Sequence, residues 1–302
     1  MTLEELKTWL DENMPGSYRE NEHMKAHTSF RIGGPADLLL IPADVDGLEK
    51  VVAKVRQEGL PLTVIGNGSN ILVRDKGIRG VVLKIGNALK SMVCDGDRLI
   101  AEAGVSLAAV ANKAAACGLT GLEFAVGIPG SIGGAVYMNA GAYDGEMEKV
   151  VRSVTVITSE GHRTVLAKAE MDFGYRHSCI QENGAIIVKV ELQLAKGKQQ
   201  DIQCKMDDFT NRRIQKQPLD VPNAGSMFRR PCGYFAGTLI EEAGLKGYRV
   251  GGAQVSVKHA GFVVNSGNAT AEDVLRLIGD VRRIVYERSG VMLEPEVRIF
   301  GE

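Results

Sequence analysis

The chain lacks the features that mark several classes of protein. Its 36 basic and 37 acidic side chains nearly cancel, which leaves a formal net charge of −1 over 302 residues. Nucleic-acid-binding domains carry a basic surface, so this balance argues against a DNA or RNA partner. No apolar run approaches the roughly 20 residues that a membrane-spanning helix needs. We therefore expect no nucleic-acid partner and no membrane partner.

Cysteine is scarce and irregularly placed. The five cysteines are odd in number, and no C-x-x-C pair occurs among them. This pattern indicates neither a disulfide framework nor a zinc site, and we expect no bound metal. Residues 2–10 have the pattern of an acidic amphipathic helix rather than of a signal peptide. These features predict a cytoplasmic protein.

Standard nucleotide-binding motifs are missing as well. No Gly-Lys-Ser or Gly-Lys-Thr occurs, and Ile71 stands where the third glycine of a Rossmann fingerprint would follow Gly66 and Gly68. Two other glycine-rich loops are present, at residues 66–70 and from residue 127 onward. Either loop alone would be interpreted as an ordinary turn. Glycine lets backbone N–H groups converge on an anion, so the two loops together favour a dinucleotide held by another fold.

The residues that we expect to hold this dinucleotide come from both loops. Ser131 and the glycines after it are typical of a helix start, which would reinforce anion binding. The candidate residues are Gly66, Asn67, Gly68, Ser69, Asn70, Gly127, Pro129, Gly130, Ser131, Gly133 and Gly134.

The order of expected elements predicts an α+β fold of two or three domains. Helices are predicted at residues 1–13, 44–58, 107–116, 201–217, 235–243 and 271–288. Strands are predicted at residues 37–41, 62–65, 71–73, 80–85, 89–94, 98–102, 150–158, 163–166, 185–194, 253–257, 261–265 and 296–300. The strict βαβ alternation of a doubly wound sheet is missing, and the best candidate for a domain boundary lies near residues 195–200.

Three short segments carry unusual polar residues: 172–178, 223–231 and 293–298. Taken alone, each has an ordinary explanation. Arg176 would form a surface ion pair, Ser226 would occupy a turn after a glycine, and Glu296 would face solvent from a strand. Spacing alone favours these explanations.

Seven motifs in one order change that interpretation. They are residues 27–34 (HTSFRIGG), 66–70 (GNGSN), 127–134 (GIPGSIGG), 174–178 (GYRHS), 224–226 (AGS), 251–253 (GGA) and 293–297 (LEPEV). From about residue 27 to residue 301, the chain resembles the UDP-N-acetylenolpyruvoylglucosamine reductase (MurB) family, whose members use FAD and NADPH in bacterial peptidoglycan precursor synthesis.

The resemblance implies a fold and a division of the chain. Residues 1–26 would form a leading helix and lead-in. Residues 27–196 would form an FAD-binding domain of the vanillyl-alcohol-oxidase (PCMH) type, built from two α+β subdomains, and residues 197–302 an α+β substrate-binding domain. FAD would be held non-covalently, because neither glycine loop contains His or Cys. The interval between Arg176 and Ser226 leaves no room for a substrate-capping insertion, which indicates the compact subclass.

The resemblance also implies a reaction, the reduction of UDP-N-acetylglucosamine enolpyruvate to UDP-N-acetylmuramate. By motif, Ser226 corresponds to the general acid, and Arg176 and Glu296 to the other two active-site residues. Arg176 would hold the substrate carboxylate, and Glu296 would stabilise the enolic intermediate. Ser226 would then protonate the α-carbon.

The substrate is a UDP-sugar, so cations should line its path. Arg213 and Lys216 share a helix face, and Lys216 precedes a turn that leads to Ser226. Arg230 stands where some relatives carry asparagine beside the substrate. The candidate substrate contacts are Tyr175, Arg213, Lys216, Arg230 and His259.

Two alternatives remain at this stage. Another FAD-dependent oxidoreductase of the same fold, such as a sugar-lactone or hydroxy-acid oxidase, would share the glycine loops but lack the Arg176, Ser226 and Glu296 set. A nucleotide-sugar sensor without activity would more naturally have lost one of the three. The sequence gives no sign of an obligatory protein partner.

Overall fold

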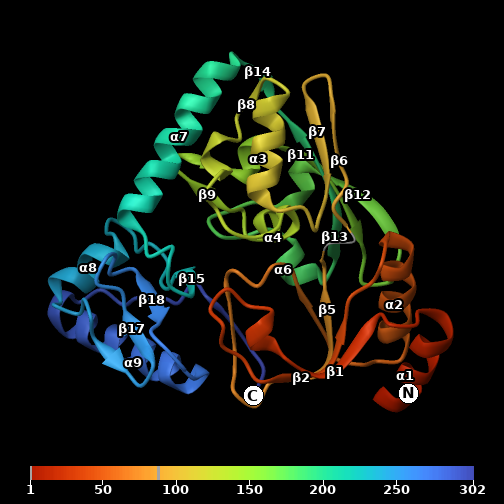
Figure 1. Ribbon diagram of the computed structural model, residues 1–302, viewed down its shortest axis with the longest axis horizontal. Coiled ribbons are helices and arrows are strands. Elements are labelled where there is room, and N and C mark those ends of the chain that lie inside the picture. The colour runs from red at the N-terminus through yellow and green to blue at the C-terminus, as the bar shows by residue number, and fades with distance from the viewer. Residues whose placement is uncertain (1, 87–88) are drawn as a thin grey trace. The chain divides into compact units, whose positions relative to one another are not determined.

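The protein has the expected mixed α+β architecture, seen in a computed structural model that describes residues 2–86 and 89–302 (Figure 1). Its contacts divide it into two compact units. The first unit comprises Met1–Arg19, Leu38–Asn67 and Gly80–Arg212. The second unit comprises Glu20–Asp37, Gly68–Arg79 and Arg213–Glu302. Each unit is therefore assembled from three separate stretches of sequence.

The first unit contains a five-stranded antiparallel sheet in the order β12-β11-β13-β7-β6. Alternate side chains of these strands, such as Leu99, Val154 and Val190, are fully buried. Helices α3 and α4 contact the same sheet (Figure 1). The bounds are β6 Met92–Asp95, β7 Arg98–Glu102, β11 Val151–Ile157, β12 Arg163–Ala167, β13 Ile186–Gln193, α3 Leu107–Ala116 and α4 Ile132–Tyr137.

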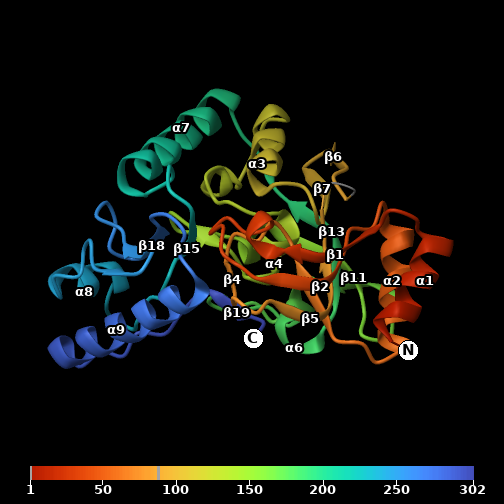
Figure 2. The same ribbon diagram turned by 60° about the horizontal axis from the view of Figure 1, so that its bottom comes forward.

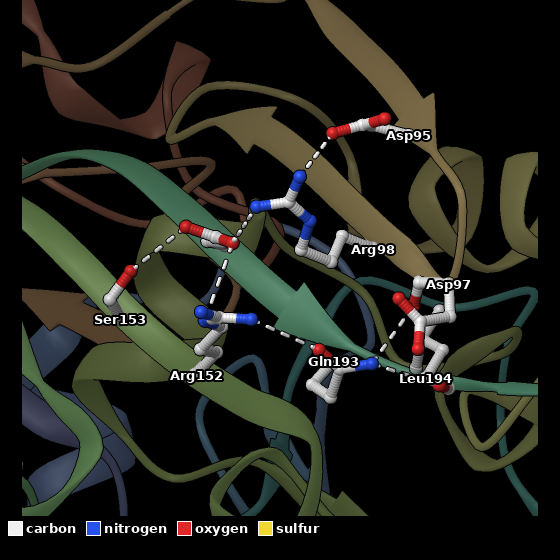
Figure 3. A network of polar contacts seen from close by, with 8 residues as sticks. Asp95, Asp97, Arg98, Arg152, Ser153, Gln193 and Leu194 are labelled. Carbon is white, nitrogen blue, oxygen red and sulfur yellow. Dashed lines mark hydrogen bonds and ion pairs between the residues drawn. The ribbon is translucent and has the colours of Figure 1, made fainter.

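Polar side chains occupy the other face of this sheet (Figure 3). The Glu191 carboxylate forms ion pairs with Arg98 at 3.3 Å and Arg152 at 3.5 Å. It also accepts a hydrogen bond from the Ser153 hydroxyl at 3.3 Å. Glu191 alternates along β13 with the buried Val190 and Leu192, whereas an irregularity in the pairing of β11 brings both Arg152 and Ser153 to Glu191. The period-2 alternation explains why the sequence pattern located these strands well.

A smaller sheet has the order β1-β2-β5-β3. Helix α2 packs its apolar face, Leu48, Val51, Val52 and Val55, into the core that also holds Leu83 of β5. Helix α1 begins at a capping box, in which Thr2 and Glu5 exchange hydrogen bonds. Residue 1 of the helix predicted at 1–13 lies outside the described residues. The bounds are α1 Leu3–Asn13, β1 Tyr18–His23, β2 Pro35–Leu40, α2 Val45–Gln57, β3 Leu62–Ile65 and β5 Ile78–Lys84.

A disulfide joins Cys94 on β6 to Cys117 at the end of α3. The expectation that the scattered cysteines form no disulfide is therefore wrong. The two residues lie 23 apart in sequence, and their Cα atoms are 6.9 Å apart. They meet because β6 and β7 form an antiparallel pair and α3 returns to contact β6. That approach depends on tertiary structure, which cysteine spacing does not report.

The second unit contains a four-stranded antiparallel sheet, in the order β15-β18-β17-β16, and two helices. Helix α9 contacts β16, β17 and α8 (Figure 2). Its buried stripe, which includes Val274, Ile278 and Val281, follows the helical period. The bounds are β15 Asn223–Ser226, α8 Ala236–Glu242, β16 Arg249–Val250, β17 Ala253–Val255, β18 Phe262–Asn265 and α9 Ala271–Ser289.

The last strand pairs with a segment from much earlier in the chain. Strand β19, Arg298–Phe300, lies parallel to β4, Ile71–Val73, within the second unit. The Asp75 carboxylate accepts hydrogen bonds from the backbone N–H groups of Ala271 and Glu272, at 2.8 and 3.0 Å. A carboxylate at these N–H groups stabilises the start of α9. The early segment 68–79 is thus an integral part of the second unit.

The remaining elements are α7 and several short pieces. Helix α7 is Gln199–Lys216, close to the predicted polar helix. The short helices are α5 Met147–Val150 and α6 Ile180–Asn183, with 3₁₀ turns at Met24–Ala26, Glu123–Ala125 and Lys168–Met171. The short strands are β8 Leu119–Thr120, β9 Gly141–Ala142, β10 Gly145–Glu146 and β14 Ala195–Lys196. Across residues 2–86 and 89–302, no helix combines the length and apolar character needed to cross a membrane.

Candidate active site

The two glycine loops predicted to hold one ligand meet in the first unit. A Cβ atom placed on Gly66 would lie 2.7 Å from the Ser131 hydroxyl oxygen, which is closer than real Cβ atoms approach. Ser131 is buried, and its hydroxyl accepts a hydrogen bond from the Gly134 N–H at 3.3 Å. The close contact between the two loops therefore depends on the absence of a side chain at position 66.

Main-chain contacts with the start of α3 fix the second loop. Ser106 and Ser131 pair in an isolated β-bridge, and the Leu107 N–H donates to the Gly130 carbonyl at 3.0 Å. The Gly133 N–H donates to the Ala103 carbonyl at 3.0 Å, and a Cβ on Gly133 would lie 2.9 Å from the Ala103 Cβ. Close approach of the backbone thus explains this glycine. The loop is a fixed main-chain surface rather than a flexible turn.

The other predicted members of the loops differ in exposure. Gly130 has a φ of +124°, a conformation that side chains of L-residues rarely adopt. Asn67 and Pro129 are exposed, whereas Gly127 and Ser69 are partly buried. A surface of glycine main chain with small polar side chains suits a diphosphate, because N–H groups can approach the anion closely.

The end of the first loop belongs to the second unit. A Cβ on Gly68 would lie 2.1 Å from the His27 carbonyl oxygen, and the Ser29 N–H donates to the Gly68 carbonyl at 3.0 Å. The Asn70 carbonyl accepts from the Arg298 N–H at 3.0 Å. Motif 27–34 and the loop at 66–70 are therefore in direct contact, which explains why both need compact residues.

Ser226 and Glu296, predicted to act together, lie close together in the second unit. The Glu296 N–H donates to the carbonyl of Met227, the residue after Ser226, at 2.9 Å. The Arg229 N–H donates to the Glu294 carbonyl at 2.8 Å. Ser226 itself is exposed at the end of β15, opposite Phe262 of β18. Main-chain hydrogen bonds on two sides hold this serine in a defined place.

Arg176, the third predicted catalytic residue, lies in the first unit on a tight turn. Gly174 and His177 exchange backbone hydrogen bonds at 3.2 and 3.1 Å, and Arg176 between them has a φ of +57°. Gln181 donates to the Arg176 carbonyl at 3.0 Å. A non-glycine residue in the left-handed region costs free energy and often marks a functional site. The guanidinium carbon lies 5.3 Å from the centre of the exposed Tyr175 ring.

The His177 side chain links this turn to Asp172 and Glu182. Its Nδ1 lies 2.8 Å from the Asp172 carbonyl oxygen, and its Nε2 lies 3.0 Å from a Glu182 carboxylate oxygen. The Asp172 carbonyl chiefly, and the Glu182 carboxylate next, raise the pKa of His177 above its ordinary value. Protonated imidazole donates through both nitrogens, so the cationic form suits both neighbours.

His259 lies in a turn of the second unit and has a defined tautomer. Its Nδ1 accepts a hydrogen bond from the Gly261 N–H at 3.1 Å, which leaves the proton on Nε2. Burial first, and the charges of Lys246 and Lys216 next, lower the pKa of His259. A neutral imidazole that carries its proton on Nε2 can donate that proton to a phosphate oxygen. Lys216 ends α7, whose last turn is held by a 2.6 Å hydrogen bond from Lys258 Nζ to the Ile214 carbonyl.

Two further predicted substrate contacts differ in exposure. Arg213 is partly buried on α7, and Arg230 is exposed after the Ser226 segment. Lys246 was not among the predicted contacts, although it influences His259 directly. Its signal in the sequence was weak, because a single lysine after a glycine-bounded turn resembles any surface lysine. In the part of the chain that the structure describes, no group of three or more metal-ligating side chains occurs.

Matches to two protein-family models define the class of protein. Residues 36–167 match the FAD binding domain family, and residues 217–300 match the family described as UDP-N-acetylenolpyruvoylglucosamine reductase, C-terminal domain. The fold is also similar to that of alkyldihydroxyacetonephosphate synthase, which superposes over 65% of this chain and 41% of that one with a TM-score of 0.50 and 14% identity. The chain is an FAD-binding α+β protein, as predicted.

Whole-chain relatives identify the family. A UDP-N-acetylenolpyruvoylglucosamine reductase of Caldanaerobacter subterraneus subsp. tengcongensis is 50% identical over 99% of this chain and 98% of its own length. One of Syntrophomonas wolfei is 52% identical over 95% and 96%. The crystal structure of the reductase (MurB) from Thermus caldophilus covers 94% of this chain and all of its own, at 35% identity and a TM-score of 0.82. The chain belongs to the UDP-N-acetylenolpyruvoylglucosamine reductase family.

Proposed function

We propose that this protein reduces UDP-N-acetylglucosamine enolpyruvate to UDP-N-acetylmuramate, with NADPH as the reductant. Family membership over the whole chain supports the reaction. The observation that carries the proposal is the hydrogen bond between the Glu296 N–H and the Met227 carbonyl, which places a carboxylate residue next to the Ser226 segment. A sugar-lactone or hydroxy-acid oxidase has no need of this pair.

The residues of the two glycine loops fit an FAD pyrophosphate. Gly66 touches Ser131, and Gly133 touches Ala103, so the loops present main chain where a Cβ would clash. The loops at 66–70 and 127–134 would hold the cofactor without a covalent bond. When bound, FAD supplies the hydride that it has taken from NADPH.

The chain's own residues would handle the charge that develops on the substrate. Hydride addition to the β-carbon of the enolpyruvyl group leaves negative charge on the α-carbon and carboxylate. Arg176 would bind that carboxylate through its planar guanidinium. Glu296 would stabilise the enolic form, and the Ser226 hydroxyl would donate its proton to the α-carbon.

The basic residues would hold the UDP portion of the substrate. The positive charges of Lys216 and Lys246 both act on His259 in the second unit, and the Glu241 carboxylate that pairs with Lys246 partly offsets them. Lys216, Lys246 and His259, together with Tyr175, Arg213 and Arg230, form the proposed contact set for the UDP-sugar. In the cell we place this activity in the cytoplasm, in peptidoglycan precursor synthesis and so in cell-wall biogenesis, cell shape and division.

Stopped-flow spectroscopy of the flavin tests the proposal. Ser226→Ala should leave reduction by NADPH nearly unchanged and slow reoxidation by the enolpyruvyl substrate by about 10²- to 10⁴-fold. Normal reoxidation in this variant would contradict the role of Ser226. Failure of the enolpyruvyl substrate to reoxidise the unmodified reduced protein would contradict the function itself.

A further inference from the structure

An exposed aromatic ring lies against one of the proposed substrate-binding cations in the second unit. The guanidinium carbon of Arg230 lies 4.0 Å from the centre of the Phe235 ring. Phe235 is 60% exposed, which is a large apolar area for water to cover. A guanidinium that stacks on a ring keeps its N–H donors directed outward around its edge.

The backbone on both sides of this pair is fixed. The Met227 N–H donates to the Gly261 carbonyl at 2.8 Å, and the Arg229 N–H donates to the Glu294 carbonyl at 2.8 Å. Arg230 therefore directly follows a segment whose main chain is hydrogen-bonded to two other segments. The Tyr234 N–H donates to the Pro231 carbonyl at 3.1 Å, and Gly233 has a φ of +74°. This turn reverses the chain and returns Phe235 to Arg230.

The pair also lies near the other groups proposed to bind substrate. Two residues after Phe235, Gly237 packs so closely on His259 that a Cβ there would lie 3.2 Å from the imidazole Cε1. His259 in turn accepts from the Gly261 N–H, and the Gly261 carbonyl accepts from Met227. Ser226, His259 and the Arg230–Phe235 pair are thus connected through Gly261.

We propose that Phe235 is a positioning residue that holds Arg230 flat for binding a nucleotide diphosphate. The proposal rests on the proposed function, because it assumes that Arg230 contacts the substrate. An arginine has many rotamers, and ordering it costs conformational entropy on binding. A ring beneath the guanidinium limits those rotamers before the ligand arrives, which lowers that cost. The ring acts through Arg230 and makes no polar contact with the ligand.

A double-mutant cycle on the FAD-loaded protein tests this proposal, with KM measured for the UDP-sugar and for NADPH. Arg230→Ala should raise the UDP-sugar KM by about tenfold or more, as expected for loss of a charge-assisted contact. Phe235→Leu should raise it by about two- to fivefold with kcat nearly unchanged, and Phe235→Tyr should restore it. Tyr234→Leu is the matched control, because Tyr234 is 49% exposed and adjacent, and it should leave both values unchanged.

The double variant, Arg230→Ala with Phe235→Leu, tests whether Phe235 acts only through Arg230. If Phe235 acts only through Arg230, the Phe235→Leu change should add nothing in the Arg230→Ala background. A further rise in KM there would mean that the ring contacts the ligand directly, and would overturn the proposal. So would an unchanged KM in Phe235→Leu alone. If Arg230→Ala itself has no effect on KM, the proposed substrate contact of Arg230 has failed instead.

The two substrates separate the sources of the diphosphate. An increase in KM for the UDP-sugar alone would assign Arg230 to the sugar nucleotide. An increase for NADPH as well would assign it to a position that both diphosphates use in turn. Either pattern supports the role of Phe235, provided that the effect of Phe235→Leu follows that of Arg230→Ala.

Discussion

The side-chain amide of Asn70 donates a hydrogen bond to the main-chain carbonyl of Glu296 over 3.4 Å, across 226 residues of sequence. The Asn70 carbonyl also accepts from the Arg298 N–H. Since the Glu296 N–H donates to Met227, a chain of hydrogen bonds runs from the first glycine loop to the proposed general acid's neighbour. A loop expected to bind the cofactor thus also fixes a residue expected to act on the substrate.

Replacement of Asn70 should therefore affect the step that needs Glu296. Asn70→Asp keeps the size of the side chain but removes the donor. We expect flavin reduction by NADPH to stay nearly normal and reoxidation by the UDP-sugar to slow about fivefold, the value of one hydrogen bond. Asn112→Asp, at an exposed position on α3, is the control. Equal reoxidation rates in both variants would show that Asn70 does not position Glu296.

Gly66→Ala should weaken FAD binding. The added methyl group would lie 2.7 Å from the Ser131 hydroxyl oxygen, so that hydroxyl would have to leave its position on the Gly134 N–H or the loops would have to shift. The ratio of flavin to protein absorbance after gel filtration measures the loss. Gly279→Ala is the control, because it adds a methyl group in open space on α9 and should keep full flavin content. Retention of flavin by Gly66→Ala would mean that the contact between the loops is not needed.

Lys216→Ala should weaken binding of the UDP-sugar and leave flavin content unchanged. Loss of one charge-assisted phosphate contact should cost about 1.5–3 kcal/mol. NADPH carries a diphosphate too, so its KM should rise if both use one pocket. Lys205→Ala, at an exposed position on the same helix, should change neither value. A rise for NADPH alone would indicate a separate nicotinamide site.

His177 should make stability depend on pH in a defined direction. Its pKa is raised in the folded protein, so its contribution is complete below its ordinary pKa and is lost as pH rises through the folded value. Urea unfolding across neutral pH should show a fall in the free energy of unfolding that His177→Gln lacks. The side chain is partly exposed, so the effect will be small and reduced by salt. Parallel pH profiles for the two proteins would contradict this assignment.

The Cys94–Cys117 disulfide should stabilise the first unit under oxidising conditions. Closing a loop of this length contributes about 3 kcal/mol in the chain-entropy description. Cys94→Ser should therefore lower the free energy of unfolding by that order, and dithiothreitol should abolish the difference. Cys204→Ser, which changes an exposed free cysteine, should have no effect in either condition. A difference that persists in dithiothreitol would point to packing rather than to the bond.

Periodicity was sufficient for the regular elements. The predicted bounds of α3, β3, β4 and β7 agree with the structure residue for residue. Helix α3 and strand β7 have a buried face with clear spacing, and β3 and β4 are short apolar runs. Strand β1 was not predicted, since its sequence YRENEH is polar and mostly exposed. Its place in a sheet is decided by pairing with distant strands, which local propensity does not report. The contact between Cys94 and Cys117 was not predicted for the same reason, because it depends on the packing of α3 against β6.

The sequence motifs indicated which segments form the candidate site, but they did not reveal the packing role of its glycines or all of its neighbouring residues. The glycines at 66 and 133 were predicted for flexibility and ligand approach, yet in the structure both also allow main chain and side chains to touch. Lys246 and Phe235 had no sequence signal, because an isolated lysine or phenylalanine is common on any surface. Their interest comes from neighbours brought to them by folding, namely His259 and Arg230.

The interleaving of the two units limits how the protein can be divided for experiments. A fragment that begins at residue 197 would lack β4, against which β19 pairs, and Asp75, which caps α9. We expect such a fragment to expose apolar surface and aggregate rather than to bind UDP-sugars alone. Ligand screening and spin or fluorophore labelling should therefore use the whole chain. Circular permutation within an exposed turn would be a safer way to relocate the termini than truncation.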